Sequence, residues 1–590
     1  MHLTTVDWLI LALFLAFSLA VGLRVAKNAS SDFSSFFLAG RRQPWWLLGV
    51  SMVATTFSTD TPNLVTDIVR RDGVLGNWTW WAFLLSGMLT VFLYAKLWRR
   101  SGVATDVEFY ELRYSGKTAA FLRIFRGVYL GLVFNVLIMA AVTLAAIKIG
   151  SVMFGWSPVQ TVVVAASVTL AYSALGGLQG VLLTDLVQFG MAMVGSVAAT
   201  VYIVRLPEVG GLSGLLAHEA VRQRTAFWPS LETTSWTDLA PVFLVPLLVQ
   251  WWAAYYPGSE PGGGGYLVQR MLSAKNESHA LGATLLFNVL HYGLRPWPWI
   301  VVALASLIVF PDLDSIQLRF PHVSADVVRN DLAYPAMLTF LPPGLLGLVV
   351  TSLAAAYMST MSTSVNWGSS ILVGDVYRRF LRPDASQGQL VWAGRWFTVL
   401  LMVLACAVSL TIESALEVFQ ILLQIGAGTG LLFLLRWFWW RINAATELAA
   451  MLASFSIALI LPMVDTGLGA WQQLVIGVTL TTGCWLPFAY LGPPSDEATL
   501  VGFYRKIRPA GPGWKRVARM AGAEVSADRS GGLIVPLLAS LLGSTAIYAL
   551  LFTTGYMLYG EIARAAMAAA VAGLSGFGLA RIWRRNGEWL

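Results

Sequence analysis

The sequence predicts an all-α protein that crosses a membrane many times. Of its 590 residues, 57% are hydrophobic and only 12% are charged, against about 25% charged residues in a soluble protein. Apolar runs of about 20 residues, the length that crosses a hydrocarbon core, recur from one end of the chain to the other. The net charge of +8 is therefore assigned to loops at the negative face of a membrane, and not to nucleic-acid binding.

Hydropathy and helix-breaking residues divide the chain into about fifteen spans. Lys and Arg gather in alternate loops, as the positive-inside rule requires; Arg42, Arg270 and Arg378 are examples on the inner side. This alternation predicts an outside N-terminus and an inside C-terminus. The predicted spans are 8–26, 45–70, 78–99, 121–149, 157–175, 180–205, 236–256, 278–310, 343–376, 389–412, 415–440, 444–463, 470–491, 532–554 and 561–583.

Two blocks of five spans run in opposite orientations, the arrangement of an inverted-repeat transporter. Each block opens with an interrupted helix, the first around Asp60 and Pro62 and the second before a Gly-rich tract at 262–265. We expect four regions. They are a first transmembrane helix with a cytoplasmic linker (1–44), the first inverted repeat (45–205), the second inverted repeat (206–442), and peripheral C-terminal helices with a cytoplasmic loop at 492–531 (443–590).

A run of hydroxyl side chains occupies the middle of the ninth predicted span, in the stretch 353–370. It includes Ser359, Thr360, Ser362 and Thr363. Uncharged oxygens at mid-membrane depth suit a weakly bound hard cation. Small and hydroxyl residues also line close helix–helix contacts, so the stretch alone permits either interpretation.

Depth favours the ion interpretation. At about 1.5 Å per residue, the centre of the interrupted span 45–70 and the centre of the span 343–376 fall at the same membrane level. A break after Ala54 would expose backbone carbonyls there, and Ser359 and Thr360 could complement them. Asp185, a carboxylate inside a predicted span, is a functional candidate by default. It lies nearer the depth of Ser362 and Thr363, so a second cation site is geometrically possible.

Patterns typical of enzymes are missing from the sequence. The five histidines show no metal-ligand spacing, and His291, inside a predicted span, fits a satisfied core residue or a proton relay. The glycine pairs lack the strand–glycine–helix context of nucleotide binding. Cys406 and Cys484 lie within predicted spans, which argues against a disulfide framework. We expect no enzymatic activity.

Four motifs resemble the sodium/solute symporter family, which includes sodium/glucose, sodium/proline and sodium/sialic acid transporters. The similarity extends over about residues 5–465. The most specific segment is YSALGGL at 172–178 followed by TDLVQ at 184–188. The others are TDVEFYELRY at 105–114, VQRMLSAK at 268–275 and AYMST at 356–360.

The resemblance implies the five-plus-five inverted-repeat fold of the leucine-transporter type and Na⁺ as the coupling ion. It implies a first sodium site made by the carbonyls of Ala54, Phe57 and Ala356 and the hydroxyls of Ser359 and Thr360. Some members bind a second sodium, and the positions that match theirs are Asp185, Ser359, Ser362 and Thr363.

The solute pocket departs from the family pattern. Tyr255, Tyr256 and a Gly-rich insertion replace the usual polar run of the seventh span, so glucose-type recognition is not expected as such. The predicted solute-pocket residues are Thr56, Asp60, Thr61, Trp81, Trp252, Tyr255, Tyr256 and Gln424.

The function that follows is sodium-coupled symport of a small organic solute (a sugar, amino acid or organic acid) by alternating access in the cell membrane. The expected partners are the solute and the lipid bilayer, and the expected state is a monomer or weak oligomer. The alternatives are a proton-coupled transporter using Asp60 or Asp185, a transporter-like membrane sensor, and a passive channel.

Overall fold

The computed structural model describes residues 3–29, 32–230, 235–253, 261–325, 327–412, 415–464, 467–522 and 532–585. This part of the chain is helical, apart from turns and an isolated β-bridge between Gln43 and Ala274. The predicted all-α class is therefore confirmed for the described residues.

Within the described residues, eleven helical segments are long and apolar enough to cross a membrane, and four shorter apolar helices accompany them. Every predicted span overlaps one of these segments. The number of crossings and the orientation of the chain ends stay predictions. The long segments are Thr5–Val25, Val74–Ser101, Gly116–Phe154, Gly176–Val204, Glu277–Val309, Leu345–Leu381, Gln387–Ser409, Val418–Leu435, Ala470–Leu491, Ile534–Leu558 and Ile562–Arg585; the shorter ones are Trp45–Thr55, Pro158–Ala171, Trp236–Leu248 and Ala444–Ile460.

The first predicted repeat opens with a broken helix, as the sequence indicated: α3 ends at Thr55 and α4 begins at Asp60. Two π-helical segments, Thr90–Tyr94 and Tyr129–Phe134, continue α6 into α7 and α9 into α10. The helices of this region are α3 (Trp45–Thr55), α4 (Asp60–Asp72), α5 (Trp78–Trp81), α6 (Leu84–Leu89), α7 (Ala95–Ser101), α8 (Phe109–Arg113), α9 (Gly116–Val128), α10 (Asn135–Phe154) and α11 (Pro158–Val204).

The predicted spans 157–175 and 180–205 meet within α11 at Gly177, whose backbone is non-helical (φ 51°, ψ −161°). An L-residue with a side chain rarely adopts a positive φ, whereas glycine does so readily. A Cβ atom at this position would also lie 2.6 Å from the carbonyl oxygen of Phe36. Glycine therefore permits both the change of direction and the close approach of α2 (Phe33–Leu38).

The second predicted repeat also opens with an interrupted helix. Short helices end at Leu248 and Trp252, and α16 begins at Gly265; residues 254–260 lie outside the described part. The helices are α12 (Gly211–Ala217), α13 (Glu219–Arg222), α14 (Trp236–Leu239), α15 (Val245–Leu248), α16 (Gly265–Ser273), α17 (Glu277–Asn288), α18 (Trp297–Val309), α19 (Leu313–Arg319), α20 (Ala333–Leu338), α21 (Leu345–Ile371), α22 (Gln387–Ser409) and α23 (Ala415–Leu435).

The segment 492–531 was predicted as a loop, and its described part, 492–522, contains two α-helices. Asp496 caps the first of them by accepting a hydrogen bond from the backbone N–H of Thr499 (2.7 Å), and Leu500, Phe503 and Ile507 are buried at helical spacing. The prolines and charges of this segment concealed that spacing. The peripheral helices are α1 (Thr5–Ala29), α24 (Ala444–Ile460), α25 (Ala470–Leu491), α26 (Glu497–Ile507), α27 (Lys515–Met520), α28 (Ile534–Leu558) and α29 (Ile562–Arg585).

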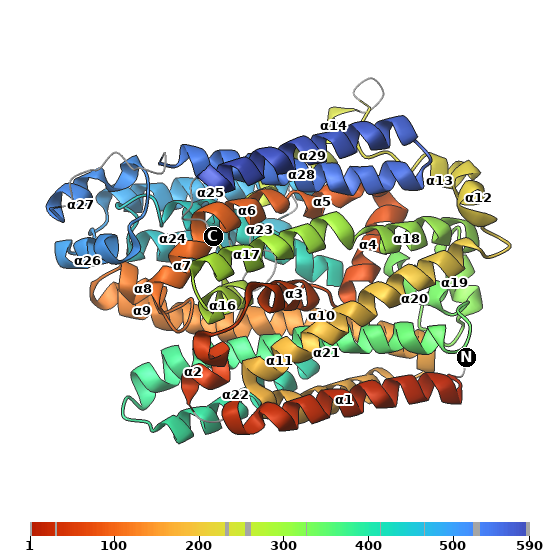
Figure 1. Ribbon diagram of the computed structural model, residues 1–590, viewed down its shortest axis with the longest axis horizontal. Coiled ribbons are helices and arrows are strands. Elements are labelled where there is room, and N and C mark those ends of the chain that lie inside the picture. Colours follow the sequence, from red (N-terminus) through yellow and green to blue (C-terminus); the bar gives the residue numbers. More distant parts are fainter. Residues whose placement is uncertain are drawn as a thin grey trace.

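Helices from both predicted repeats pack around α3, which lies near the centre of the molecule in Figure 1. α17 packs against α3, and α21 packs against α11. α1 lies along α11 and α21 at one side, while α28 and α29 pair at the opposite side. The broken helix is therefore enclosed by protein, which is the condition for irregular backbone at membrane depth.

Candidate functional site

The break between α3 and α4 is held in place by specific contacts. Pro62 lies in the first turn of α4, where its missing N–H costs no intrahelical bond. The hydroxyl of Thr59 donates to the carbonyl oxygen of Val142 in α10 (3.0 Å). Phe57 stacks on Trp299 of α18, with ring centroids 5.1 Å apart. The non-helical backbone of the break is thus fixed by two neighbouring helices, α10 and α18.

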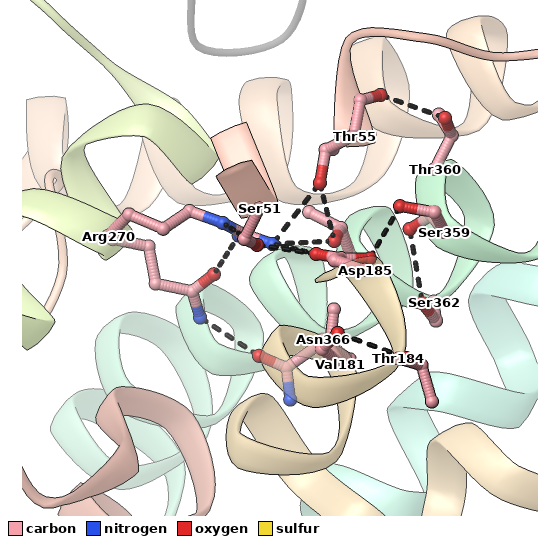
Figure 2. A network of polar contacts seen from close by, with 12 residues as sticks. Ser51, Thr55, Val181, Thr184, Asp185, Arg270, Ser359, Thr360, Ser362 and Asn366 are labelled. Carbon is pink, nitrogen blue, oxygen red and sulfur yellow. Dashed lines mark hydrogen bonds and ion pairs between the residues drawn. The ribbon is translucent and has the colours of Figure 1, made fainter. Parts of the chain in front are cut away.

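Thr360 of α21 meets this break. Its hydroxyl donates to the carbonyl oxygen of Thr55 (2.8 Å) and lies 3.4 Å from that of Phe57. Thr360 and Phe57 are buried, with 1% and 2% of their surface exposed. Figure 2 shows Thr360 and Thr55 facing each other. The sequence-predicted meeting of the hydroxyl run with the broken helix is present in the structure.

The remaining members of the first predicted set surround the same point. Ala54 and Ala356 are both buried, and Ala356 stands one helical turn before Thr360. The carbonyl of Ala54 accepts from the N–H of Phe57 (3.2 Å), which leaves it a second lone pair. Ser359 differs from Thr360, because its hydroxyl donates to Asp185 of α11 (2.6 Å).

Asp185 is fully buried and lies at the centre of a polar network (Figure 2). Its second carboxylate oxygen accepts a short hydrogen bond from Ser51 of α3 and lies 3.7 Å from the guanidinium of Arg270. A buried carboxylate is tolerated when it is paired and hydrogen-bonded. Asp185 therefore links α3, α11, α16 and α21.

Arg270 was predicted as a charge of an inner loop, and that prediction was wrong. The whole of α16 is buried, and the side chain of Arg270 is 0% exposed. Its guanidinium donates to Thr363 (2.7 Å), and also to Thr55 and Ser51. The sequence did not indicate this burial, because an arginine in a predicted inner loop agrees with the positive-inside rule.

Among the members of the second predicted set, Asp185 and Ser359 contact each other directly, and Arg270 stands between Asp185 and Thr363. The hydroxyl of Ser362 donates to the carbonyl of Ser359 in its own helix (3.1 Å). The two predicted sets are therefore adjacent and share Ser359.

A cavity opens beside the break. Three of the predicted solute residues, Thr56, Asp60 and Thr61, line it. The sequence reasoning did not assign Trp80, Lys148, Arg295 and Asp331 to the pocket, although all four line it, as does His291. Lys148 and Asp331 form an ion pair there (2.6 Å).

His291 and Arg295 join the cavity wall to the break. Arg295 donates to Nε2 of His291 (3.3 Å) and, with its other terminal nitrogen, to Thr56 and the carbonyl of Val53. Because a guanidinium has no acceptor, Nε2 must be the unprotonated nitrogen. Nδ1 then carries the proton and donates to Thr56 (3.0 Å), so His291 is a neutral imidazole in this arrangement.

Three other predicted solute residues, Trp81, Trp252 and Gln424, do not line this cavity. Trp81 packs against Trp78 and Phe552 and does not line this cavity. The indole N–H of Trp252 donates to the carbonyl of Ala427 (3.1 Å), and Gln424 lies close to Gly477 of α25. Tyr255 and Tyr256 lie outside the described residues.

The groups at the break that could bind an ion suit a monovalent hard cation. They are backbone carbonyls and hydroxyls, with one carboxylate nearby. Within the described residues, no group of three or more His, Cys, Asp or Glu side chains could hold a metal ion. Divalent and transition metals prefer such charged or nitrogen- and sulfur-bearing sets, so the chemistry at the break favours a cation that tolerates neutral oxygens.

Curated proteins and solved structures resemble the chain over most of its length. A sodium/glucose cotransporter of Vibrio parahaemolyticus is 24% identical over 495 residues, which is 81% of this chain and 89% of that protein. A sodium/myo-inositol cotransporter of Bos taurus is 27% identical over 530 residues, 84% of this chain and 69% of the relative.

A Na⁺-coupled sialic acid symporter, solved in a substrate-bound outward-open state, shares the fold, with a TM-score of 0.68 and 21% identity. The match covers 84% of this chain and 99% of that structure. The sequence profile described as the sodium:solute symporter family matches residues 36–454, well over half of the chain. The protein therefore belongs to the sodium:solute symporter family.

Proposed function

We propose that the protein imports a small organic solute together with Na⁺ by alternating access. The observation that carries this proposal is the contact of Thr360 with the carbonyls of Thr55 and Phe57 beside the cavity that Thr56 and Asp60 line. An ion held there would bind α21 and the broken helix at the same time. Its presence would therefore alter the wall of the cavity.

The proposed sodium site consists of the carbonyls of Ala54, Phe57 and Ala356 and the hydroxyls of Ser359 and Thr360. A Na⁺ among these groups would replace the hydrogen bond between Thr360 and Thr55 by ion–oxygen contacts. Thr56 couples ion and solute, because it belongs to the break and lines the cavity. Entry of Na⁺ into the cell contributes about 2.3 kcal/mol per 100 mV of membrane potential, before its concentration gradient is counted.

The second set, Asp185, Ser359, Ser362 and Thr363, is the weaker candidate for an ion. A cation there would share Asp185 and Thr363 with the guanidinium of Arg270. Two positive charges close to one buried carboxylate repel each other strongly in a medium of low dielectric constant. We therefore propose one coupled Na⁺ per cycle.

Fifteen spans, an outside N-terminus and an inside C-terminus remain our proposed topology, with the inverted repeats at 45–205 and 206–442. The arrangement of the molecule supports it. The helices α12 and α13, from the predicted outer loop, lie at one end of the molecule, and α26 and α27, from the predicted inner loop, lie at the other (Figure 1). The broken openings at 56–59 and after Leu248 occupy corresponding places in the two blocks.

The test is solute uptake by proteoliposomes under an imposed Na⁺ gradient, with the variants Thr360→Val and Thr360→Ser. Valine keeps the shape of threonine but removes its hydroxyl, so we expect Na⁺-driven accumulation to fall by at least about tenfold, the effect of losing one charge-assisted contact. Serine retains the hydroxyl and should keep most of the activity.

Ser370→Ala is the matched control, because the Ser370 hydroxyl is buried in the same helix and donates to the carbonyl of Trp367 (2.7 Å). Equal accumulation by Thr360→Val and the wild type would refute the proposed site. Uptake that follows a pH gradient with Na⁺ absent would instead support proton coupling, and solute flux without accumulation would indicate a channel.

A further inference from the structure

A groove runs along one face of α17. It is separate from the cavity beside the break, and the two share no described lining residue. The volume of the groove is about 560 Å³. Trp45 at the start of α3 and Trp583 near the end of α29 also line it, so three segments that are far apart in the sequence meet here. The lining residues of α17 lie at helical spacing on one face; from its second residue onwards they are Ser278, His279, Gly282, Leu285, Leu286 and Val289.

The groove changes from polar to apolar along its length. Ser278 and His279 lie at its start, whereas Leu285, Leu286 and Val289 lie further along the helix. From Ser278 to Val289 the helix rises about 16 Å, close to the roughly 15 Å of hydrocarbon in one leaflet of a bilayer. The groove therefore has the polarity and the length of a lipid that lies along the helix, with its headgroup at the first turn.

Hydrogen-bond donors gather at the polar end. The backbone N–H of Trp45 donates to Nδ1 of His279 (3.0 Å), so Nδ1 is unprotonated and Nε2 carries a proton that it can donate. The amide oxygen of Asn276, which also lines the groove, accepts from the backbone N–H of His279 (2.9 Å). This leaves the NH₂ group of Asn276 as a donor, and Ser278 adds a hydroxyl. Donors of these kinds match the oxygens of a phosphate group, which only accept hydrogen bonds.

Positive charges flank the same end of the groove. Lys275 directly precedes the polar end, and Arg584 and Arg585 directly follow the lining tryptophan of α29; all three are exposed. The neighbouring Glu277 is already paired with Arg100 through both of its carboxylate oxygens (3.0 and 2.8 Å). Glu277 therefore does not cancel these charges. Basic groups beside a gap between membrane helices are typical of sites for anionic lipid headgroups.

We propose that the α17 groove binds an anionic phospholipid. The phosphate lies among the donors and cations at the first turn of α17, and one acyl chain lies along Leu285, Leu286 and Val289. Trp45 and Trp583 are the amphipathic aromatic residues usual at the level of lipid headgroups. The proposal goes beyond the proposed function, because it concerns neither the coupling ion nor the solute. It rests on the proposed topology only for the leaflet, which is the inner one.

The experiment titrates the purified full chain in detergent with one lipid at a time and measures the bound fraction by native mass spectrometry. The probes are phosphatidylglycerol, phosphatidylcholine with the same acyl chains but no net charge, and glycerol 3-phosphate, which has the phosphate without acyl chains. Each Lys or Arg near an anionic headgroup strengthens binding about fivefold. We expect phosphatidylglycerol to bind at least about tenfold more tightly than phosphatidylcholine, and glycerol 3-phosphate to bind more weakly than phosphatidylglycerol.

A pair of charge substitutions tests the headgroup end. Lys275→Gln combined with Arg584→Gln should weaken phosphatidylglycerol by about tenfold or more and leave phosphatidylcholine unchanged, because two of the attracting charges are removed. Both residues are exposed, so the fold should tolerate the change. The matched control combines Lys506→Gln with Arg519→Gln, two exposed cations of α26 and α27 on the same predicted side. It should change neither affinity.

A bulky substitution tests the acyl-chain end. Val289→Trp places a large side chain in the apolar part of the groove. Excluding two methylene groups of the lipid costs about tenfold in affinity, so both lipids should bind about tenfold more weakly and the ratio between them should stay the same. Val571→Trp, at an exposed position of α29 outside the groove, is the matched control and should leave both affinities unchanged.

Four results would overturn the proposal. They are equal affinities for the two lipids, an equal loss in the control charge pair, glycerol 3-phosphate binding as tightly as phosphatidylglycerol, and a dimer whose formation excludes the lipid. The third result would identify a site for free phosphate, and the fourth would identify a contact between two copies of the chain. Should Val289→Trp fail to fold, the lipid ratio and the charge variants still decide. None of these results bears on sodium coupling.

Discussion

At the scale of single residues, the ion pair of Asp185 and Arg270 makes the sharpest prediction. Both side chains are fully buried and lie 3.7 Å apart. Removing one partner of a buried pair leaves an uncompensated charge and costs about 3–5 kcal/mol, whereas removing both is far less damaging. Asp185→Asn and Arg270→Gln should each destabilise the protein, and the double variant should be more stable than the sum of the two effects implies.

The measurement is a double-mutant cycle by thermal unfolding in detergent. The exposed pair Arg564 and Glu561 (2.7 Å) provides the control cycle, and its coupling should stay below about 1 kcal/mol. Additive losses at Asp185 and Arg270 would contradict the electrostatic account of this network.

Sodium stoichiometry is a second residue-scale prediction. With Arg270 donating to Thr363, one Na⁺ at the first set should suffice for transport. The Na⁺ dependence of charge movement should then have a Hill coefficient close to one, and Thr363→Ser, which keeps the hydroxyl, should not change it. A coefficient near two that falls in Ser362→Ala would show that the second set also binds Na⁺.

At the scale of elements, Glu111 ties three helical segments together at the predicted inner side. It belongs to α8 and accepts hydrogen bonds from Arg123 of α9 (2.5 Å) and from Arg379 (3.2 Å) in the π-helical segment Leu372–Leu381. Partial burial acts to raise the pKa of Glu111, but the hydrogen bonds from Arg379 and Arg123 outweigh it and hold the pKa below its usual value.

A lowered pKa in the folded state means that the ionised carboxylate stabilises the fold. This contribution is complete above the ordinary glutamate pKa of 4.5 and is lost as the pH falls through the lower folded value. The melting temperature of the wild type should therefore drop more steeply below about pH 5 than that of Glu111→Gln. Parallel pH profiles for the two proteins would show that these contacts contribute no stability.

The elements also explain which parts of the site the sequence could reveal. The broken helix at 56–59 was predictable, because Asp60 and Pro62 interrupt an apolar span. Thr360 and Asp185 were predictable as polar groups at membrane depth. Trp80 and Trp81 illustrate the limit: neighbouring residues on a helix point about 100° apart, so only one can face the cavity. The packing of α5 sets the rotation of the helix about its axis, and this rotation places Trp80 at the cavity wall.

Arg295 was a visible signal that the sequence reasoning passed over. It lies near the middle of the predicted span 278–310, where a charge is costly and marks a functional site by default. His291 stands four residues earlier and therefore on the same helix face. Arg270 carried no such signal, since its burial depends on how α16 packs beneath the break and not on local sequence.

At the scale of the whole molecule, the protein is a multi-pass membrane transporter of the sodium:solute symporter family. The proposed topology makes a direct prediction about its two sides. After Cys406 and Cys484 are replaced by serine, a cysteine at exposed Ser213 should react from outside intact cells with a membrane-impermeant maleimide. A cysteine at exposed Ala498 should react only after the cells are opened. The reverse pattern would invert the orientation, and equal accessibility of both would change the span count.

The hydroxyl of Ser359 has a consequence for how strongly the site attracts a cation. The hydroxyl has one hydrogen, which it donates in the hydrogen bond to Asp185. Both lone pairs of the oxygen then remain for other partners, and the hydrogen bond to a carboxylate makes that oxygen more negative. In the proposed sodium site, Asp185 would thus make the Ser359 oxygen a stronger ligand without itself contacting the ion. Arg270 of α16 lies 3.7 Å from the other oxygen of the same carboxylate. A substitution at Arg270 should therefore change the sodium affinity of the proposed site while every proposed ion ligand stays in place.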